Sequence, residues 1–241
     1  MPQSRSVLLL GATGLVGGEC LRLLQRNDNF SRIVVLTRAE MDYGLLGPKV
    51  EHHIIDFEHL TSAARYFAVD QIICALGTTM KAARTKKRFR TIDLLYPITA
   101  AHLGLEKKAS HFLVVSSLGA DPRSPIFYNR IKGELEKALT ALPLRALTIA
   151  RPSVLTGKRE KQRTGERIAA TFSFLTPAKI RPIPAADVAS ALVHQAVLDQ
   201  PGKRILESAD LRRIADDIRS PRAVPQLKLD STVEVSQTSV A

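Results

Sequence analysis

The chain has 241 residues, 45% of them hydrophobic, with a formal net charge of +12 and two cysteines. A chain of this size and hydrophobic content can bury a core of its own, so it needs no disulfide or structural metal to hold it together. Cys20 lies in a helical pattern and Cys74 in an apolar run, contexts that suit a reducing compartment, so we expect a cytoplasmic protein.

The N-terminal region resembles a signal peptide only superficially. Glycines interrupt the apolar run that follows Arg5, and no small-x-small cleavage site comes after it. No other segment approaches the ~18 apolar residues of a membrane span. The sequence therefore predicts a soluble, uncleaved chain with no membrane partner.

Short apolar or β-branched runs recur along the first 150 residues, with helical patterns between them. Apolar residues repeat at helical spacing after Gly14 and again from Ile131 to Leu142. This alternation indicates βαβ units, so the expected fold class is α/β, a Rossmann-type doubly wound parallel sheet. The predicted strands are SVLLL (6–10), RIVVLT (32–37), HHIID (52–56), QIICAL (71–76), HFLVVSS (111–117) and RALTIA (145–150).

Past residue 152 this rhythm breaks. We expect residues 1–219 to form a single domain of this Rossmann type in which 152–219 is a small C-terminal cap over the carboxyl edge of the sheet. The cap should contain helices in RIAATFSFL, PIPAADVASALVHQAVL and SADLRRIADDI. Residues 220–241 are polar and without periodicity, which predicts a disordered tail.

A glycine-rich turn follows the first predicted strand directly. Gly11, Gly14 and Gly17 form G-x-x-G-x-x-G and lead into the first helix. In such a turn the glycines allow the bend, the approach of a diphosphate and the close packing of helix on strand. The phosphates then face free N–H groups at the helix N-terminus. The pattern predicts a dinucleotide site, with a tight turn that binds no ligand as the alternative.

The residue type at the end of the second strand indicates which dinucleotide is preferred. An acidic residue that binds an NAD ribose is expected about 20 residues after the glycine turn. This sequence has Thr37 and Arg38 there. Because an arginine can pair with a 2′-phosphate, we expect NADP(H) as the cofactor. The alternative is that Arg38 is an ordinary surface cation.

Tyr128 and Lys132 are spaced to share one face of a helix. A phenol ionises near pH 10, and an ammonium one turn away supplies at most ~3 kcal/mol of the ~4 kcal/mol that a shift of three units requires. The pair therefore makes sense as a proton donor only beside a bound cofactor. Ser117, and second to it Ser116, would steady the substrate oxygen at the end of the fifth strand. Alternatively, Tyr128 and Lys132 lie on the surface of a helix without a chemical role, and the two serines form a helix cap or a turn.

Two basic runs, 81–90 and 158–167, hold six and five Lys or Arg residues. Either run can be a solvated face, or it can gather an anionic cofactor and a carbonyl substrate that is itself anionic. Phe89 is the only aromatic residue in the two runs, so we rank nucleic acid well below a small molecule. The sequence EHH at 51–53 places adjacent histidines on opposite faces of a strand, so no metal site is expected.

Six motifs occur in order along the chain: GATGLVG, DFEHL, CALGTT (74–79), VVSSLGAD (114–121), Y-x-x-x-K-G-E-L-E and RPSVLTG. Together they resemble the short-chain dehydrogenase/reductase superfamily and, more narrowly, its atypical Tat-interacting-protein-like branch. The resemblance spans roughly residues 5 to 200 and implies NADPH in the glycine turn.

The resemblance also implies cofactor contacts by motif position. It places Thr13, Gly14, Leu15 and Val16 at the phosphates, Arg38 and Asp56 on the adenosine side, and Leu76, Gly77, Leu155 and Arg163 elsewhere along the cofactor. Asp93 falls near a helix position where many superfamily members carry Asn, and a proton-relay role is not carried over to it.

Two functional hypotheses follow. The first is an NADPH-dependent oxidoreductase acting on a small carbonyl or alcohol through Tyr128, Lys132 and a serine. The second keeps the cofactor and drops the chemistry, as a regulatory or scaffold protein that binds NADPH and a protein partner.

Overall fold

The structure, a computed structural model, describes residues 4–157 and 181–220. The strands are β1 (Arg5–Leu10), β2 (Phe30–Thr37), β3 (Val50–Ile54), β4 (Gln71–Cys74), β5 (His111–Val115), β6 (Ala146–Arg151), β7 (Leu155–Thr156), β8 (Ile183–Pro184) and β9 (Gly202–Glu207). The α-helices are α1 (Leu15–Gln25), α2 (Met80–Ala83), α3 (Lys86–Arg90), α4 (Tyr96–Glu106), α5 (Phe127–Ala141), α6 (Ala185–Leu198) and α7 (Ser208–Arg219). Two 3₁₀ helices and a π-helical turn complete the set: η1 (Tyr43–Leu45), η2 (Phe57–Phe67) and η3 (Thr91–Leu95).

Seven strands form one parallel sheet in the order β3-β2-β1-β4-β5-β6-β9. The chain moves outward from β1 to β3, then crosses back to β4 and continues in the other direction. This is the doubly wound Rossmann arrangement, so the predicted fold class is confirmed. In sheets of this kind the direction changes between β1 and β4, and ligands bind beside the carboxyl ends of the strands there.

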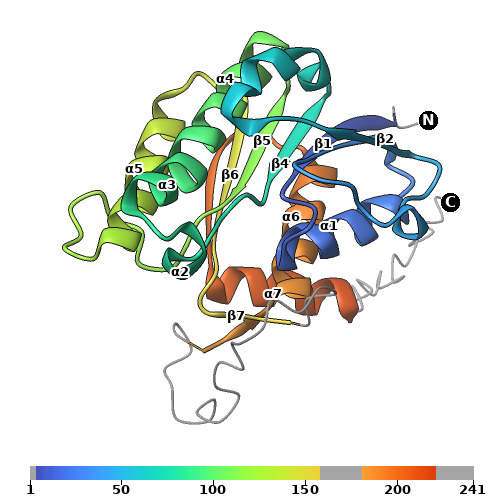
Figure 1. Cartoon of the computed structure of the whole chain (residues 1–241). Helices are drawn as coiled ribbons and strands as arrows, with labels where there is room; N and C mark the ends of the chain where they lie inside the picture. The colour runs from blue at the N-terminus through green and yellow to red at the C-terminus, as the bar shows by residue number, and fades with distance from the viewer. Residues whose placement is uncertain (1–3, 158–180, 221–241) are drawn as a thin grey trace, which may run out of the picture.

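The two faces of the sheet bury separate hydrophobic layers. Side chains alternate along β1, so that Leu8 and Leu10 join one core cluster while Val7 and Leu9 join the other. All four are 0% exposed. Helices α4 and α5 cover the first face, and α1 and α6 cover the second (Figure 1). Burial on both faces explains why the central strands read as continuous apolar runs.

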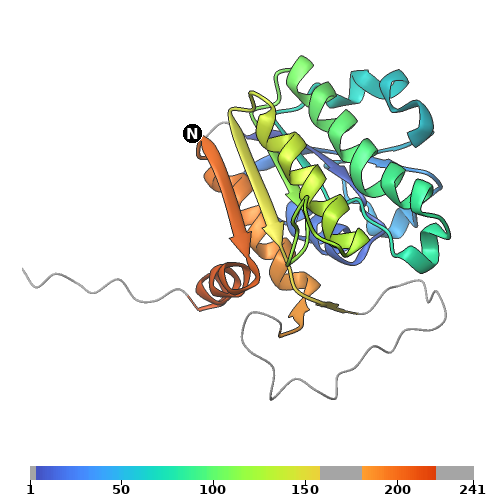
Figure 2. The ribbon, with the colours of Figure 1, turned by 90° about the vertical axis from the view of Figure 1, so that its left-hand side faces the viewer.

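The described part of the segment beyond residue 152 contributes a strand, β9, to the main sheet. Strand β9 pairs with β6 as the seventh strand, α6 packs against α1, and α7 follows β9 directly (Figure 2). The helices predicted in 182–198 and 208–218 correspond to α6 and α7. The helix predicted in RIAATFSFL and the tail beyond residue 220 lie outside the described residues. Within the described ranges, no helix has the length and apolar character needed to cross a bilayer.

Candidate cofactor and active site

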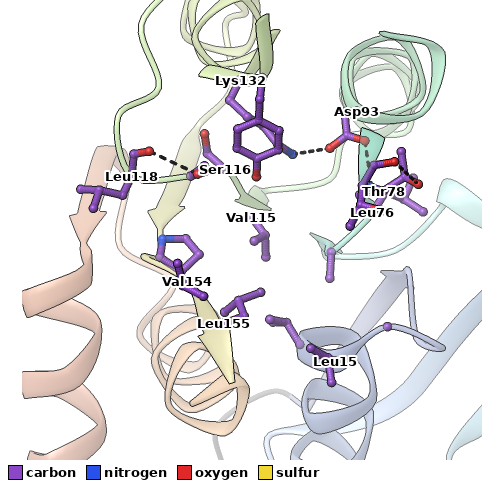
Figure 3. Close-up of a pocket in the computed structure, with 18 of the residues that line it drawn as sticks. Leu15, Leu76, Thr78, Asp93, Val115, Ser116, Leu118, Lys132, Val154 and Leu155 are labelled. Atoms are coloured by element: carbon purple, nitrogen blue, oxygen red, sulfur yellow. Dashed lines mark hydrogen bonds and ion pairs between the residues drawn. The ribbon is translucent and has the colours of Figure 1, made fainter. Parts of the chain in front are cut away.

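A cavity of about 420 Å³ opens at the carboxyl edge of the sheet, on both sides of the point where the strand order reverses (Figure 3). It is bounded by the first turn of α1, the segments after β4 and β5, one side of α5 and the segment that leads into β7. The sequence-predicted site residues that line it are Gly14, Leu15, Val16, Leu76, Gly77, Ser116, Ser117, Tyr128, Lys132 and Leu155.

The glycine turn allows two close approaches of backbone to backbone. Gly11 has φ +87°, a conformation that disfavours a side chain, and a Cβ there would lie 2.5 Å from the Ala75 carbonyl oxygen. A Cβ on Gly17 would lie 2.0 Å from the Gly11 carbonyl oxygen. These glycines therefore let α1 begin directly against the turn and against the end of β4.

Helix α1 begins at the cavity with its backbone N–H groups uncapped. Its N-cap residue is Gly14, no side chain caps the helix, and the first turn carries no acidic residue. The free N–H groups and the positive end of the helix dipole favour an anion at this point. The chemistry of the turn therefore fits the diphosphate of a dinucleotide. Thr13 lies in the same turn and is exposed, although it does not line the cavity.

Arg38 and Asp56 lie outside the cavity. Arg38 follows β2, is exposed, and forms no hydrogen bond or ion pair with any residue that the structure describes. Asp56 caps η2 by accepting the Glu58 N–H at 2.9 Å, and its second oxygen lies 2.8 Å from His59 Nδ1. The hydrogen bond from Glu58, supported by His59, lowers the pKa of the Asp56 carboxyl. Arg163 lies outside the described residues.

Tyr128 and Lys132 both line the cavity from α5, as their spacing predicted. The Tyr128 ring packs edge-on against Phe89, with 5.7 Å between ring centroids. Lys132 is buried, and its Nζ lies 2.8 Å from Asp93 Oδ1. Burial alone would lower the pKa of the Lys132 ammonium, but the charge of Asp93 and the proximity of Tyr128 outweigh burial and raise it.

Asp93 is a cavity residue that sequence reasoning had left without a role. It lies in η3, is 1% exposed, and accepts the Thr78 backbone N–H through Oδ2 at 2.9 Å (Figure 3). It therefore links α5 to the segment after β4. A sequence signal did exist, because Asp93 is a single carboxylate in the otherwise apolar stretch TIDLL, and buried carboxylates are almost always paired.

The two serines after β5 have different partners. Ser116 is buried and donates a hydrogen bond to Glu136 at 2.5 Å, while Arg151 holds the same carboxylate at 2.5 Å. Ser117 is only partly buried and donates a long bond of 3.2 Å to the Leu118 carbonyl oxygen. The Ser116 hydroxyl is thus committed to the protein interior, and Ser117 has the hydroxyl that can turn toward a ligand.

The basic run 81–90 forms α2 and α3 immediately after Thr79, which lines the cavity. Part of its charge is used within the fold, since Arg88 pairs with Glu58, and Arg90 with Glu134. Phe89 is 0% exposed and belongs to the core, so its ring is not available to a base. The run 158–167 lies outside the described residues.

The cysteines offer no nucleophile at this site. Both are fully buried, and burial raises the pKa of the Cys20 and Cys74 thiols to about 12. Among the described residues, no group of three or more His, Cys, Asp or Glu is arranged to hold a metal ion.

Two relatives match nearly the whole chain. Protein HTATIP2 of Rattus norvegicus is 29% identical over 226 residues, covering 91% of this chain and 93% of the rat protein. Protein FMP52, mitochondrial, of Lodderomyces elongisporus is 30% identical over 235 residues, covering 90% of this chain and 99% of the fungal protein. No protein-family model matches the chain.

Solved structures of low identity share the fold. A putative NAD-dependent epimerase/dehydratase from Bacillus halodurans is 23% identical with a TM-score of 0.61, covering 88% of this chain and 99% of that chain. The Bordetella bronchiseptica enzyme WbmH in complex with NAD+ is 14% identical with a TM-score of 0.64, covering 93% and 84%. The chain therefore has the nucleotide-binding fold found in NAD-dependent epimerases and dehydratases.

The relatives contradict one expectation. We expected a cytoplasmic protein from the two cysteines and the N-terminus, but the FMP52 relatives from Lodderomyces elongisporus, Candida albicans and Saccharomyces cerevisiae are all named mitochondrial. Reduced, buried cysteines are compatible with more than one compartment, so the cysteine argument could not make this distinction.

The relatives match along nearly the whole length of the chain. A fungal relative that is 30% identical is covered over 99% of its own length. The chain belongs to the HTATIP2/FMP52 family, in the atypical branch of the short-chain dehydrogenases/reductases.

Proposed function

We propose that the protein is an NADPH-dependent oxidoreductase of the short-chain dehydrogenase type that acts on a small carbonyl or alcohol substrate. One observation carries the proposal. The uncapped start of α1, the Tyr128 and Lys132 side chains and the Ser117 hydroxyl all border the same cavity. A dinucleotide site and a proton donor are therefore close enough to act on one substrate.

The residues available to hold NADPH are distributed along the carboxyl edge of the sheet. The N–H groups of Gly14, Leu15 and Val16 would bind the diphosphate, and Leu76, Gly77 and Leu155 would pack along the nicotinamide half. Arg38 would pair with the 2′-phosphate, and Asp56 would lie on the adenosine side. That Arg38 has no partner among the described residues supports this assignment.

Bound NADPH would supply the hydride that goes to the carbonyl carbon. In that step the carbonyl oxygen gains a proton, which the Tyr128 hydroxyl gives up, and in the reverse reaction Tyr128 takes it back. Ser117 donates a hydrogen bond to the same oxygen and orients it. Lys132 stabilises the phenolate that remains after proton transfer.

A second function keeps the cofactor without turnover, as an NADPH-binding regulatory protein. The Lys132–Asp93 pair favours it, because a carboxylate 2.8 Å from the ammonium weakens the field that would activate Tyr128. Both functions use the same cavity.

Turnover of a panel of aldehydes and ketones, followed by NADPH absorbance, tests the first function. Replacing Tyr128→Phe removes the proton donor and should lower kcat about 10²–10⁴-fold, the usual contribution of a general acid. The affinity for NADPH should change little. NADPH binding without oxidation of NADPH by any carbonyl compound would favour the regulatory function.

A further inference from the structure

The ion pair between Lys132 and Asp93 lies almost entirely out of solvent. The two side chains are 4% and 1% exposed, and the atoms Nζ and Oδ1 are 2.8 Å apart. Buried charges are screened little by salt, so both the carboxylate and the ammonium act on their surroundings. The lysine is therefore not a single positive charge beside Tyr128.

Each carboxylate oxygen of Asp93 has its own donor. Oδ1 accepts from Lys132, and Oδ2 accepts the Thr78 N–H at 2.9 Å (Figure 3). A neutral asparagine would turn an NH₂ group toward one of these two donors, so a carboxylate fits both contacts and an amide does not. The fold thus fixes a negative charge next to the ammonium.

Among the described residues that line the cavity with Tyr128, Asp93 is the acidic side chain and Lys132 the basic one. Burial keeps the Cys74 thiol at the end of β4 neutral at physiological pH, with its pKa at about 12. Phe89, which packs on the Tyr128 ring from α3, carries no charge. The neighbouring Phe127 ring has two cations over it, the side chains of Lys86 on α3 and Arg130 on α5. Of these groups, Asp93 and Lys132 are the pair that lines the cavity with Tyr128.

We propose that Asp93 is a positioning residue that holds Lys132 and cancels much of the field of its ammonium at Tyr128. The carboxylate then opposes the loss of the phenol proton, and the phenol with its proton is the form that donates to a carbonyl oxygen. This inference rests on the proposed function for the role of Tyr128, but it can be tested without a substrate.

The test is the ionisation of Tyr128 itself, followed by tyrosinate absorbance. The chain has four tyrosines and no tryptophan, so no indole absorbance interferes. Subtracting the titration of Tyr128→Phe from that of the parent isolates residue 128, and the same subtraction is made in the Asp93→Asn background. Loss of the Asp93 charge should move this ionisation toward acid by about one to two pH units.

The matched control is Glu134→Gln, because Glu134 lies on α5 with Tyr128 and Lys132. It also removes one carboxylate, but Glu134 is paired with Arg90 and is 30% exposed, so the Tyr128 ionisation should stay in place. Asp93→Ser is a second neutral variant, small enough to admit water beside Lys132. Thermal unfolding and NADPH affinity establish that each variant is folded.

The outcomes separate this inference from the proposed function. An acid shift in both neutral variants, with none in the Glu134→Gln control, supports it even if no carbonyl compound is turned over, in which case only the proposed function fails. An unshifted Tyr128 ionisation in folded Asp93 variants overturns it. Loss of the fold in both neutral variants would assign the ion pair to stability alone and would overturn it as well.

Discussion

Two adjacent serines at the end of β5 should give opposite phenotypes. Ser116→Ala removes a donor from the buried Glu136 carboxylate and should lower the free energy of unfolding by about 1–3 kcal/mol. Ser117→Ala loses only a long bond to the Leu118 carbonyl oxygen, so stability should change by less than ~0.5 kcal/mol. If Ser117 orients the substrate, its loss should lower kcat about 10²-fold. Urea unfolding measures the stability of each variant, and NADPH oxidation measures its kcat. A loss of stability in Ser117→Ala together with a loss of activity in Ser116→Ala would exchange the two roles.

Arg38 tests the choice of dinucleotide. Arg38→Gln should weaken NADPH binding about 10–100-fold, the worth of one hydrogen-bonded charge pair, and leave NADH binding unchanged. Arg26→Gln is the matched control, because Arg26 is also exposed but lies at the opposite end of α1 from the glycine turn. Titrations with both dinucleotides decide the result. Equal binding of NADH and NADPH by the parent would remove Arg38 from the site.

Spacing alone could pair Tyr128 with Lys132, because residues four apart share a helix face. It could not pair Lys132 with Asp93, since that contact depends on how η3 packs against α5. Ser117 was ranked above Ser116 from the sequence, but the physical reason was not available there, because the distinction depends on Glu136, which lies on a different element. Local geometry was thus readable from the sequence, and contacts between elements were not.

At the scale of elements, Gly17 and Gly18 in α1 should respond differently to the same substitution. A Cβ at Gly17 would meet the Gly11 carbonyl oxygen at 2.0 Å, so Gly17→Ala must push the helix away from the turn. We expect a loss of several kcal/mol in the free energy of unfolding and weaker NADPH binding.

Gly18→Ala is the control on the same helix. Its Cβ would lie 3.4 Å from the Ala12 carbonyl oxygen, an ordinary contact, and alanine favours a helix over glycine by about 1 kcal/mol. This variant should be as stable as the parent or more stable. Thermal unfolding of the two proteins compares them, and equal destabilisation would show that close packing at Gly17 does not matter.

Strands that are buried in the structure were predicted accurately from the sequence, and edge strands were not. The apolar runs at 6–10, 71–76 and 111–117 mark strands that are buried in the structure. The run at 52–56 is displaced, since β3 is Val50–Ile54, an edge strand in which Glu51 and two histidines leave no clear apolar pattern. Strand β9 was missed because it begins Gly-Lys-Arg and lies at the other edge, largely exposed. Edge strands bury too little to leave an apolar signal.

At the scale of the whole molecule, the two ends of the sheet have different chemistry. The carboxyl edge holds the cavity, and the amino edge holds a buried polar group formed by Gln71, His111 and Thr148 from three neighbouring strands. Gln71 donates to the Ala196 carbonyl oxygen at 2.9 Å, which ties the sheet to α6. This end has no part in the proposed chemistry, so a titration there should affect stability without changing the site.

His111 should make the stability of the whole chain depend on pH. It is 1% exposed, its Nε2 lies 2.9 Å from Thr148 Oγ1, and burial lowers its pKa from 6.5 to about 4, although Asp199 opposes the shift. In the unfolded chain His111 binds a proton near pH 6.5, whereas in the folded chain it binds one only near pH 4. Neutral His111 therefore makes its full contribution to the free energy of unfolding above about pH 6.5, and about 3 kcal/mol of that free energy is lost as pH falls toward 4.

His111→Gln should remove that pH dependence, because an amide can keep the hydrogen bond to Thr148 but does not titrate. His102→Gln, at an exposed position on α4, is the control and should leave the dependence as in the parent. Urea unfolding of the three proteins between about pH 7 and about pH 4 gives the slopes. Equal slopes in the parent and His111→Gln would mean that His111 takes up its proton in the folded state as readily as in the unfolded chain. The acid sensitivity of the molecule would then have to come from its carboxylates, whose ion pairs are lost on protonation.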